Sequence, residues 1–245
     1  ADLAQACNRM AASLQQAESS RRALTADIAH ELRTPLAVQR AHLEALQDGI
    51  YPLNAENLQP VLEQNLALTR LVDDLRTLAM ADSGQLKLEF SPTDLIALVS
   101  RLVEQFHPQA DPRRITLRFE HPGLETLRVQ VDALRIEQIL TNLLSNALRY
   151  TPEGGEISVR AQTLPGRAIV SVRDTGPGIP PEALDRVFER FYRVDRARSR
   201  AEGGSGLGLA IARQLAEAHS GTLEARNHPQ GGAEFILTLP TEKRQ

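Results

Sequence analysis

The chain has 245 residues and a mass of 27.0 kDa, which leaves room for one large domain or two domains of ordinary size. Hydrophobic residues make up 42% and charged residues 24%, so the composition is that of a soluble globular chain and excludes disordered and collagen-like classes. A net charge of −3 gives no general attraction to nucleic acid or to an anionic membrane, and the single cysteine excludes a disulfide framework and a cysteine metal cluster.

Residues 1–82 are predicted to form two long helices joined by a short loop. The leucines and isoleucines from Leu24 to Ile50 fall within about a 120° arc of a helical wheel. Gly49 is typical of the end of a helix, and Asn54 is typical of the start of the next one. Because one such hairpin cannot cover its own apolar stripe, we expect two copies to pair into a four-helix bundle, which makes the protein a homodimer.

Strands and helices alternate after a break at Asp82-Ser83-Gly84. Helical spacing predicts helices over residues 94–106, 132–150 and 206–219. Alternating apolar residues predict strands around residues 115–119, 127–131, 157–161, 169–172 and 233–239. The predicted fold is therefore multidomain, with an all-α antiparallel hairpin followed by an α/β sandwich of about 150 residues.

His30 is predicted to lie on the outer face of the first helix, opposite the apolar arc. A lone exposed histidine is most often an ordinary surface residue, but here Glu31 stands beside it and Thr34 shares its face. A carboxylate that takes the proton of one ring nitrogen makes the other nitrogen more nucleophilic. Pro35 removes an amide donor from the helix, so we expect a bend there.

Three separated segments carry residue types that suit a phosphate or nucleotide site. Asp174-Thr175-Gly176-Pro177-Gly178-Ile179 follows a predicted strand, and its carboxylate can accept a hydrogen bond from an exocyclic amine. Residues 203–209 are rich in glycine and open a predicted helix, where free backbone amides favour phosphate. Asn142, Asn146 and Arg149 share one stripe of the helix 132–150. Taken singly, these patterns also fit a turn, a generic glycine-rich loop and a solvated helix face.

The order of these motifs resembles that of the two-component sensor histidine kinases. The histidine segment, the asparagine helix, Asp-x-Gly-x-Gly, Phe188-Glu189-Arg190-Phe191-Tyr192-Arg193 and Gly-x-Gly-x-Gly follow one another like the H, N, G1, F and G2 boxes of that family. Residues 43–49 and 200–206 are similar to the BaeS-type envelope-stress sensors. The resemblance implies four parts: the end of a HAMP-like signalling helix (1–20), a HisKA-type dimerisation and histidine phosphotransfer domain (21–84), a linker (85–91) and a GHKL (Bergerat) ATP-binding catalytic domain (92–245).

The resemblance also implies roles for the matching residues. His30 is expected to accept the γ-phosphoryl group of ATP, with Glu31 as the general base. Thr34 is expected to orient a water that dephosphorylates the partner regulator, and Arg193 to neutralise charge on the transferring group. Asn146 is expected to coordinate Mg²⁺. The expected nucleotide contacts are Asn142, Asn146, Arg149, Tyr150, Asp174, Gly176, Gly178, Ile179, Gly204, Gly206, Leu207 and Gly208.

The implied partners are a second copy of the chain and the receiver domain of a response regulator, and no nucleic acid. The chain has no run of 18 apolar residues and no visible signal peptide. We expect transmembrane and sensor segments upstream in the full-length protein, with this region a soluble part on the cytoplasmic side of the bacterial inner membrane.

Other functions remain open on the same residues. ATPases of the same fold carry a glutamate as general base where this chain has Asn142, so efficient hydrolysis is disfavoured. A degenerate relay without kinase activity is disfavoured because His30, Asn146, Asp174 and both glycine-rich segments are intact. Nucleic-acid binding through the arginines of residues 186–200 is disfavoured because acidic residues are interspersed and aromatic residues are few.

Overall fold

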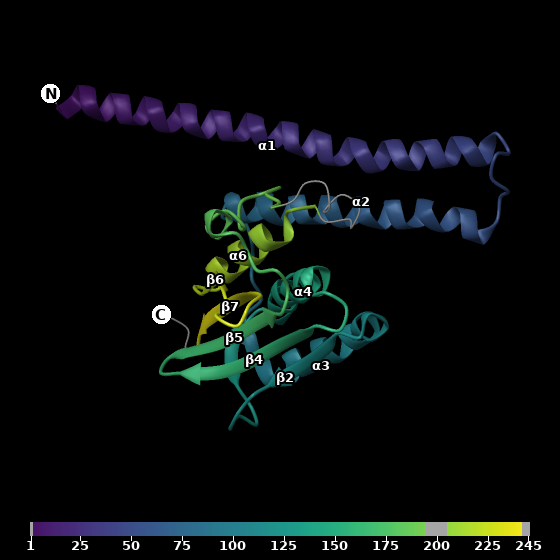
Figure 1. Ribbon diagram of the computed structural model, residues 1–245. Coiled ribbons are helices and arrows are strands. Elements are labelled where there is room, and N and C mark those ends of the chain that lie inside the picture. Colours follow the sequence, from purple (N-terminus) through teal and green to yellow (C-terminus); the bar gives the residue numbers. More distant parts are fainter. Residues whose placement is uncertain (1, 195–204, 242–245) are drawn as a thin grey trace. The chain divides into compact units, whose positions relative to one another are not determined.

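The computed structural model describes residues 2–194 and 205–241 (Figure 1). The chain divides into two compact units, Ala1–Asp73 and Asp74–Gln245. No helix in the described part is both long and apolar enough to cross a membrane.

The first unit contains a helical hairpin. α1 spans Asp2–Gln47 and continues through Pro35, and α2 spans Ala55–Asp82, so its last turns belong to the second unit. The predicted ends are confirmed, because Gly49 has φ +73° and the Asn54 side-chain oxygen accepts a hydrogen bond from the Asn57 N–H at 2.8 Å. The axis of α1 changes direction in its second half (Figure 1), in agreement with the bend expected near Pro35.

The hairpin leaves much of its apolar stripe exposed within one chain. Leu36 and Leu43 of α1 are 52% and 46% exposed, and Leu62 and Leu66 of α2 are 57% and 56% exposed. A second copy of the hairpin would bury these side chains. The homodimer stays a prediction, which these exposed leucines favour.

The second unit begins with the end of α2, where Thr77 and Leu78 are buried. A short strand, β1 (Ser91–Asp94), pairs antiparallel with β3 (Arg128–Val131). α3 (Leu95–Ala110) follows β1, and its first turn is capped by the Asp94 carboxylate, which accepts from the Ile96 N–H at 3.0 Å.

A five-stranded sheet forms one layer of this unit, in the order β2-β4-β5-β7-β6. The two strands nearest one edge, β2 and β4, are parallel, and the other neighbours are antiparallel. In register, Val159 lies opposite Val172, and Val172 lies opposite Phe235. The strands are β2 (Thr116–Glu120), β4 (Glu156–Leu164), β5 (Arg167–Asp174), β6 (Thr222–Asn227) and β7 (Ala233–Pro240).

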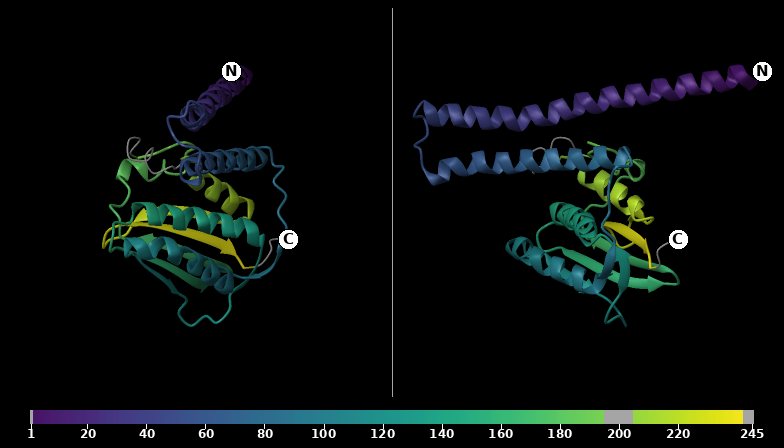
Figure 2. Two further views of the ribbon diagram at one scale, coloured as in Figure 1. Left: turned by 90° about the vertical axis from the view of Figure 1, so that its right-hand side faces the viewer. Right: turned by 180° about the vertical axis from the view of Figure 1, so that it is seen from behind.

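Three helices form the other layer, as Figures 1 and 2 show: α3, α4 (Ala133–Tyr150) and α6 (Gly208–Ala218). Alternate residues of the central strands are buried beneath them, so the apolar face of the sheet and the apolar stripes of the helices share one core. The largest fully buried side chains include Phe235, Leu95, Leu102, Ile136, Leu143, Ile157, Leu207 and Leu215.

The predicted fold class is confirmed, and the three helices expected in this unit are present. β1 and β6 were not predicted. β1 has four residues and contains Pro92, which weakens a strand pattern. β6 has one buried side chain, Leu223, among mostly polar neighbours, so its alternation is too weak to stand out from the sequence.

Candidate functional site

Asp174 is the most constrained carboxylate among the predicted site residues. It ends β5, is 3% exposed, and its Oδ1 accepts hydrogen bonds from the Gly176 N–H at 2.8 Å and the Ala233 N–H at 3.3 Å. Burial raises the pKa of this carboxyl above its usual range, against the opposing effect of these two hydrogen bonds and of the Arg173 charge.

The second oxygen of Asp174 is available to a ligand. Among residues 2–194 and 205–241, Oδ2 makes no hydrogen bond. Burying a carboxylate costs free energy that is recovered only when its lone pairs find donors. A carboxylate held by one oxygen and open at the other is suited to accept from an exocyclic amine.

Gly176 brings the turn after β5 against the end of α4. A Cβ at Gly176 would lie 2.6 Å from the Tyr150 carbonyl oxygen and 2.8 Å from Asp174 Oδ1. Glycine is therefore required here by the close approach of other protein atoms. Tyr150 is 39% exposed at the same end of α4, where its ring is accessible.

Gly178 and Ile179 complete the turn, but their backbone is already engaged by another residue. Gly178 has φ +77°, and a Cβ there would lie 2.9 Å from Asn227 Oδ1. The Ile179 N–H donates to that oxygen at 2.8 Å, and the Asn227 side-chain amide donates to the Ile179 carbonyl at 2.6 Å. Sequence reasoning missed Asn227, which lies 48 residues from Ile179 along the chain.

The asparagine helix and the glycine-rich segment meet at Asn142 and Gly208. The Asn142 side-chain amide donates to the Gly208 carbonyl at 3.0 Å, and a Cβ on Gly208 would lie 3.2 Å from Asn142 Oδ1. Asn142 therefore links α4 to the start of α6. Its amide has no basic lone pair with which to take a proton from water.

Asn146 lies one turn after Asn142 and is half-buried. Its carboxamide makes no hydrogen bond to any residue that the structure describes. A free carboxamide oxygen is a hard ligand of the kind that Mg²⁺ accepts, so this residue fits the expected metal. Arg149, also half-buried, lies a turn further along and engages other groups of the protein.

The end of α4 is held by Arg113, which sequence reasoning also missed. Its guanidinium donates to the carbonyl oxygens of Leu148 and Thr151, the latter at 2.7 Å. Thr151 is fully buried, and its hydroxyl donates back to the Ala147 carbonyl at 2.7 Å. These bonds satisfy carbonyl groups that a helix end leaves without partners. Arg113 thereby fixes the end of the helix that carries the polar stripe.

The start of the glycine-rich segment is also constrained. Gly206 has φ +72°, and a Cβ there would lie 2.9 Å from the Phe191 Cα. Leu207 is 0% exposed, so its side chain belongs to the core and only its backbone could touch a ligand. Gly204 lies outside the described residues, and Arg193 is half-buried near the end of the preceding described stretch.

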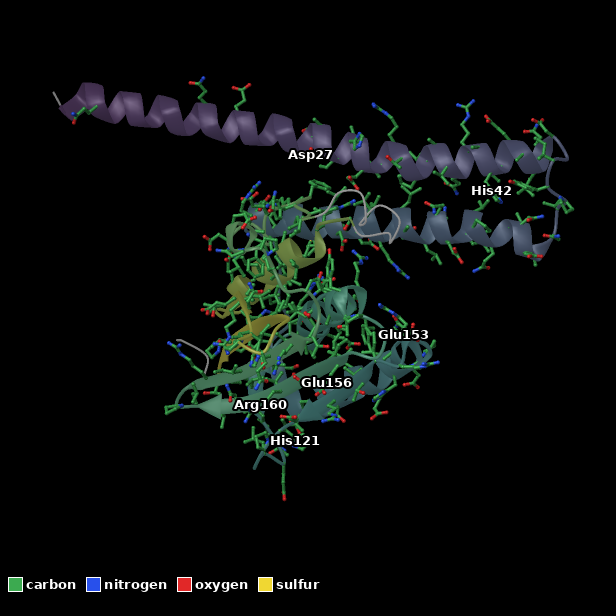
Figure 3. All side chains as sticks on the ribbon, viewed as in Figure 1. Asp27, His42, His121, Glu153, Glu156 and Arg160 are labelled. Carbon is green, nitrogen blue, oxygen red and sulfur yellow. The ribbon has the colours of Figure 1, made fainter. Side chains whose placement is uncertain are left out.

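The candidate nucleophile lies in the first unit. His30 is exposed and Glu31 is half-buried, while the Thr34 hydroxyl donates to the His30 carbonyl at 3.4 Å. The other histidine of α1, His42 (labelled in Figure 3), has partners within the hairpin. Its Nε2 lies 2.8 Å from the Asn57 carbonyl oxygen, and its ring stacks on that of Tyr51 with 5.3 Å between the ring centroids. His30 is therefore the accessible imidazole of the pair.

Two family models match the chain. Residues 20–84 match the His Kinase A (phospho-acceptor) domain, and residues 131–243 match the family described as Histidine kinase-, DNA gyrase B-, and HSP90-like ATPase. The first match contains His30, and the second contains the asparagine helix and both glycine-rich segments.

Named relatives agree with these matches. The chain is 41% identical over 241 residues to the signal transduction histidine-protein kinase BaeS of Escherichia coli K12, covering 98% of this chain and 51% of that protein. It therefore spans about half the length of this curated relative.

The solved structure of Acinetobacter baumannii histidine kinase AdeS has a TM-score of 0.74 and 28% identity, covering 87% of this chain and 98% of that one. The catalytic domain of histidine kinase ThkA has a TM-score of 0.56 and 32% identity, covering 62% of this chain and 96% of that one. ThkA in complex with the response regulator protein TrrA has a TM-score of 0.71 and 27% identity, covering 90% of this chain and 62% of that one.

Proposed function

Because the chain belongs to the two-component sensor histidine kinases, we propose that it transfers the γ-phosphoryl group of ATP to His30 and from there to an aspartate of a response regulator. A nucleotide substrate is best supported by the hydrogen bonding of the Asp174 carboxylate. One oxygen accepts from two backbone N–H groups, and the other has no partner in the described part of the chain.

The second unit would bind the nucleotide through a few residues with separate tasks. Asp174 Oδ2 would accept a hydrogen bond from the adenine amine, while Gly176, Gly178 and Ile179 would shape the pocket around the base. Tyr150 and Arg149 would contact the nucleotide from the end of α4. Backbone amides of the glycine-rich segment (Gly204, Gly206, Leu207 and Gly208) would face the phosphates.

Mg²⁺, held by Asn146 with Asn142 nearby, would supply positive charge against the phosphate oxygens. The carboxamide of Asn146 supports this assignment, because it makes no hydrogen bond to the residues that the structure describes. Arg193 would add a second positive charge on the side of the transferring group.

In the transfer, a lone pair on one His30 ring nitrogen forms a bond to the γ-phosphorus, and the bond from that phosphorus to the bridging oxygen breaks, releasing ADP. Glu31 would accept the proton that the imidazole loses from its other nitrogen. The exposed ring of His30 supports this role, because a buried imidazole could not be reached by a second domain.

The phosphoryl group would then pass to a response regulator, and the chain would also dephosphorylate that regulator, with Thr34 orienting the attacking water. The ThkA–TrrA complex supports a partner of this class. A homodimer formed through residues 21–84, the HAMP-like identity of residues 1–20 and the location on the cytoplasmic side of the inner membrane are part of the same proposal.

The test is incubation with γ-labelled ATP and Mg²⁺, followed by separate counts of labelled protein and free phosphate. We expect acid-labile label on the protein that disappears in His30→Gln and persists in His42→Gln, the matched change at the other histidine of α1. Free phosphate without labelled protein would show a hydrolytic ATPase instead. If neither labelled protein nor free phosphate forms, the chain is a relay without kinase activity.

A further inference from the structure

The carboxamide of Asn227 pairs with both backbone groups of Ile179. Asn227 is the last residue of β6, and Ile179 ends the turn that begins at Asp174. Its Oδ1 accepts from the Ile179 N–H at 2.8 Å and its Nδ2 donates to the Ile179 carbonyl at 2.6 Å. A side-chain amide used in this way replaces the donor and acceptor that a neighbouring strand would provide.

The chain leaves space for this amide. A Cβ on Gly178 would lie 2.9 Å from Asn227 Oδ1, which is closer than side-chain carbons approach such an atom. Gly178 therefore has two reasons to be glycine: its φ of +77° and the approach of the Asn227 side chain.

The same hairpin also supports the other end of the turn. Ala233 of β7 lies opposite Asn227 in the ladder, and its N–H donates to Asp174 Oδ1 at 3.3 Å. A Cβ on the preceding residue, Gly232, would lie 1.8 Å from the Asp174 carbonyl oxygen. The hairpin of β6 and β7 thus holds Asp174 and Ile179, which are the two ends of the turn.

We propose that Asn227 is a positioning residue for the purine base, which acts by holding the turn 174–179 so that Asp174 Oδ2 meets the exocyclic amine of adenine. This inference rests on the proposed nucleotide function and adds a determinant of base selectivity to it. Asn227 is itself exposed and lies outside the apolar core, so its removal leaves the core of the unit intact.

The test compares the binding of ADP and IDP, which differ at the position of the exocyclic amine, to the whole chain. We expect wild type to prefer ADP. In Asn227→Ala we expect the dissociation constant of ADP to rise by about 10-fold, which is the scale of one or two lost positioning hydrogen bonds. We expect the ratio of the IDP dissociation constant to the ADP dissociation constant to fall toward one. The KM for ATP in autophosphorylation should rise with it, while kcat stays within about twofold.

Two further variants separate positioning from stability. Asn227→Asp keeps the size and the acceptor for the Ile179 N–H but faces the Ile179 carbonyl with oxygen, so we expect the same loss of base selectivity. Gln230→Ala removes an exposed amide from the same β6–β7 turn and should leave the ratio unchanged. A merely structural role for Asn227 would lower the amount of active protein without changing the ratio, and that result would overturn the inference. If wild type itself fails to bind ADP, the proposed function fails; if wild type discriminates and both Asn227 variants do so equally well, only this inference fails.

Discussion

Gly206 and Phe191 lie against each other through their backbones. The Phe191 N–H donates to the Gly206 carbonyl at 3.0 Å, and a Cβ on Gly206 would fall 2.9 Å from the Phe191 Cα. Both residues have positive φ, +72° at Gly206 and +58° at Phe191. This contact fixes where the chain enters α6, within the glycine-rich segment whose amides are proposed to face phosphate.

Gly206→Ala should therefore damage both stability and nucleotide binding. Its Cβ would meet backbone that cannot move aside, so we expect ADP affinity to fall by about 10-fold or more, equivalent to about 1.4 kcal/mol, and the melting temperature to drop. Gly166→Ala is the matched control, because Gly166 has φ +73° with nothing within 4 Å of a Cβ. It should cost about 1 kcal/mol of stability from backbone strain alone and leave ADP affinity unchanged. Calorimetric melting and ADP titration check both variants, and equal effects from the two would contradict the role of the Phe191 contact.

Much of the fold and of the candidate site was predictable because the responsible signals are local. Helical spacing located α3, α4 and α6, and the glycines at 176 and 178 fitted a turn, which the structure has directly after β5. The exposure of His30 followed from its position on the helical wheel. Each of these features depends on a pattern of residues that are near one another in the sequence.

The supporting residues were not predictable because they act over long separations. Asn227 contacts Ile179 across 48 positions, and Arg113 reaches Thr151 across 38. An asparagine at the end of a strand and an arginine at the end of a short 3-10 helix (Asp111–Arg113) look like ordinary surface residues until the fold brings their partners to them. For the same reason, the sequence did not show that the Leu207 side chain is fully buried while its neighbours border the site.

Arg113→Lys should destabilise the second unit although the charge is kept. Lysine cannot donate to two carbonyl groups through a planar fork, so one carbonyl at the end of α4 loses its charged donor. We expect a loss of about 1–3 kcal/mol in the free energy of unfolding, measured by urea denaturation. Arg114→Lys is the neighbouring control. The Arg114 side chain is 82% exposed, and its Nε forms a surface ion pair with Glu153 Oε1 at 3.8 Å. It should change stability by less than about 0.5 kcal/mol. Similar losses from both changes would argue against the capping role of Arg113.

Asp174→Asn should separate stability from nucleotide binding. Burial raises the pKa of Asp174, so the stability of the nucleotide-free protein falls as the pH rises from the usual value of 3.8 to the raised pKa, and the loss is complete above it. Asparagine keeps an acceptor for the Gly176 and Ala233 N–H groups and removes the charge, so the melting temperature near neutral pH should stay equal or rise. ADP affinity should fall by about 10- to 100-fold, because the amide presents a donor instead of an acceptor to the adenine amine. Asp185→Asn, at an exposed carboxylate, controls for the change in net charge. A lower melting temperature in Asp174→Asn would contradict the expected effect on stability, and an unchanged ADP affinity would contradict the expected contact with adenine.

His219 links α6 to the start of α4 as a neutral imidazole. It is 3% exposed, its Nδ1 lies 2.7 Å from the Leu215 carbonyl, and its Nε2 accepts a hydrogen bond from the Asp132 N–H at 3.1 Å. Nδ1 therefore carries the proton, and protonation of Nε2 would remove the acceptor for Asp132. Burial lowers the pKa of His219, against the opposing effects of the hydrogen bond to the Leu215 carbonyl and of the Asp132 charge, and the Arg135 charge lowers it further.

The second unit should therefore lose stability in mild acid through this residue. The unfolded chain takes up a proton at His219 near pH 6.5, whereas the folded chain resists it until a lower pH, so the unfolded state binds more protons between the two values. The contribution of His219 is complete above about pH 6.5 and is lost as the pH falls toward its folded pKa. His219→Gln supplies an amide that can donate to Leu215 and accept from Asp132 without titrating. Urea denaturation from about pH 7.5 to 5 should show a steeper fall in the free energy of unfolding for wild type than for His219→Gln, and parallel curves would show that His219 does not contribute to acid sensitivity.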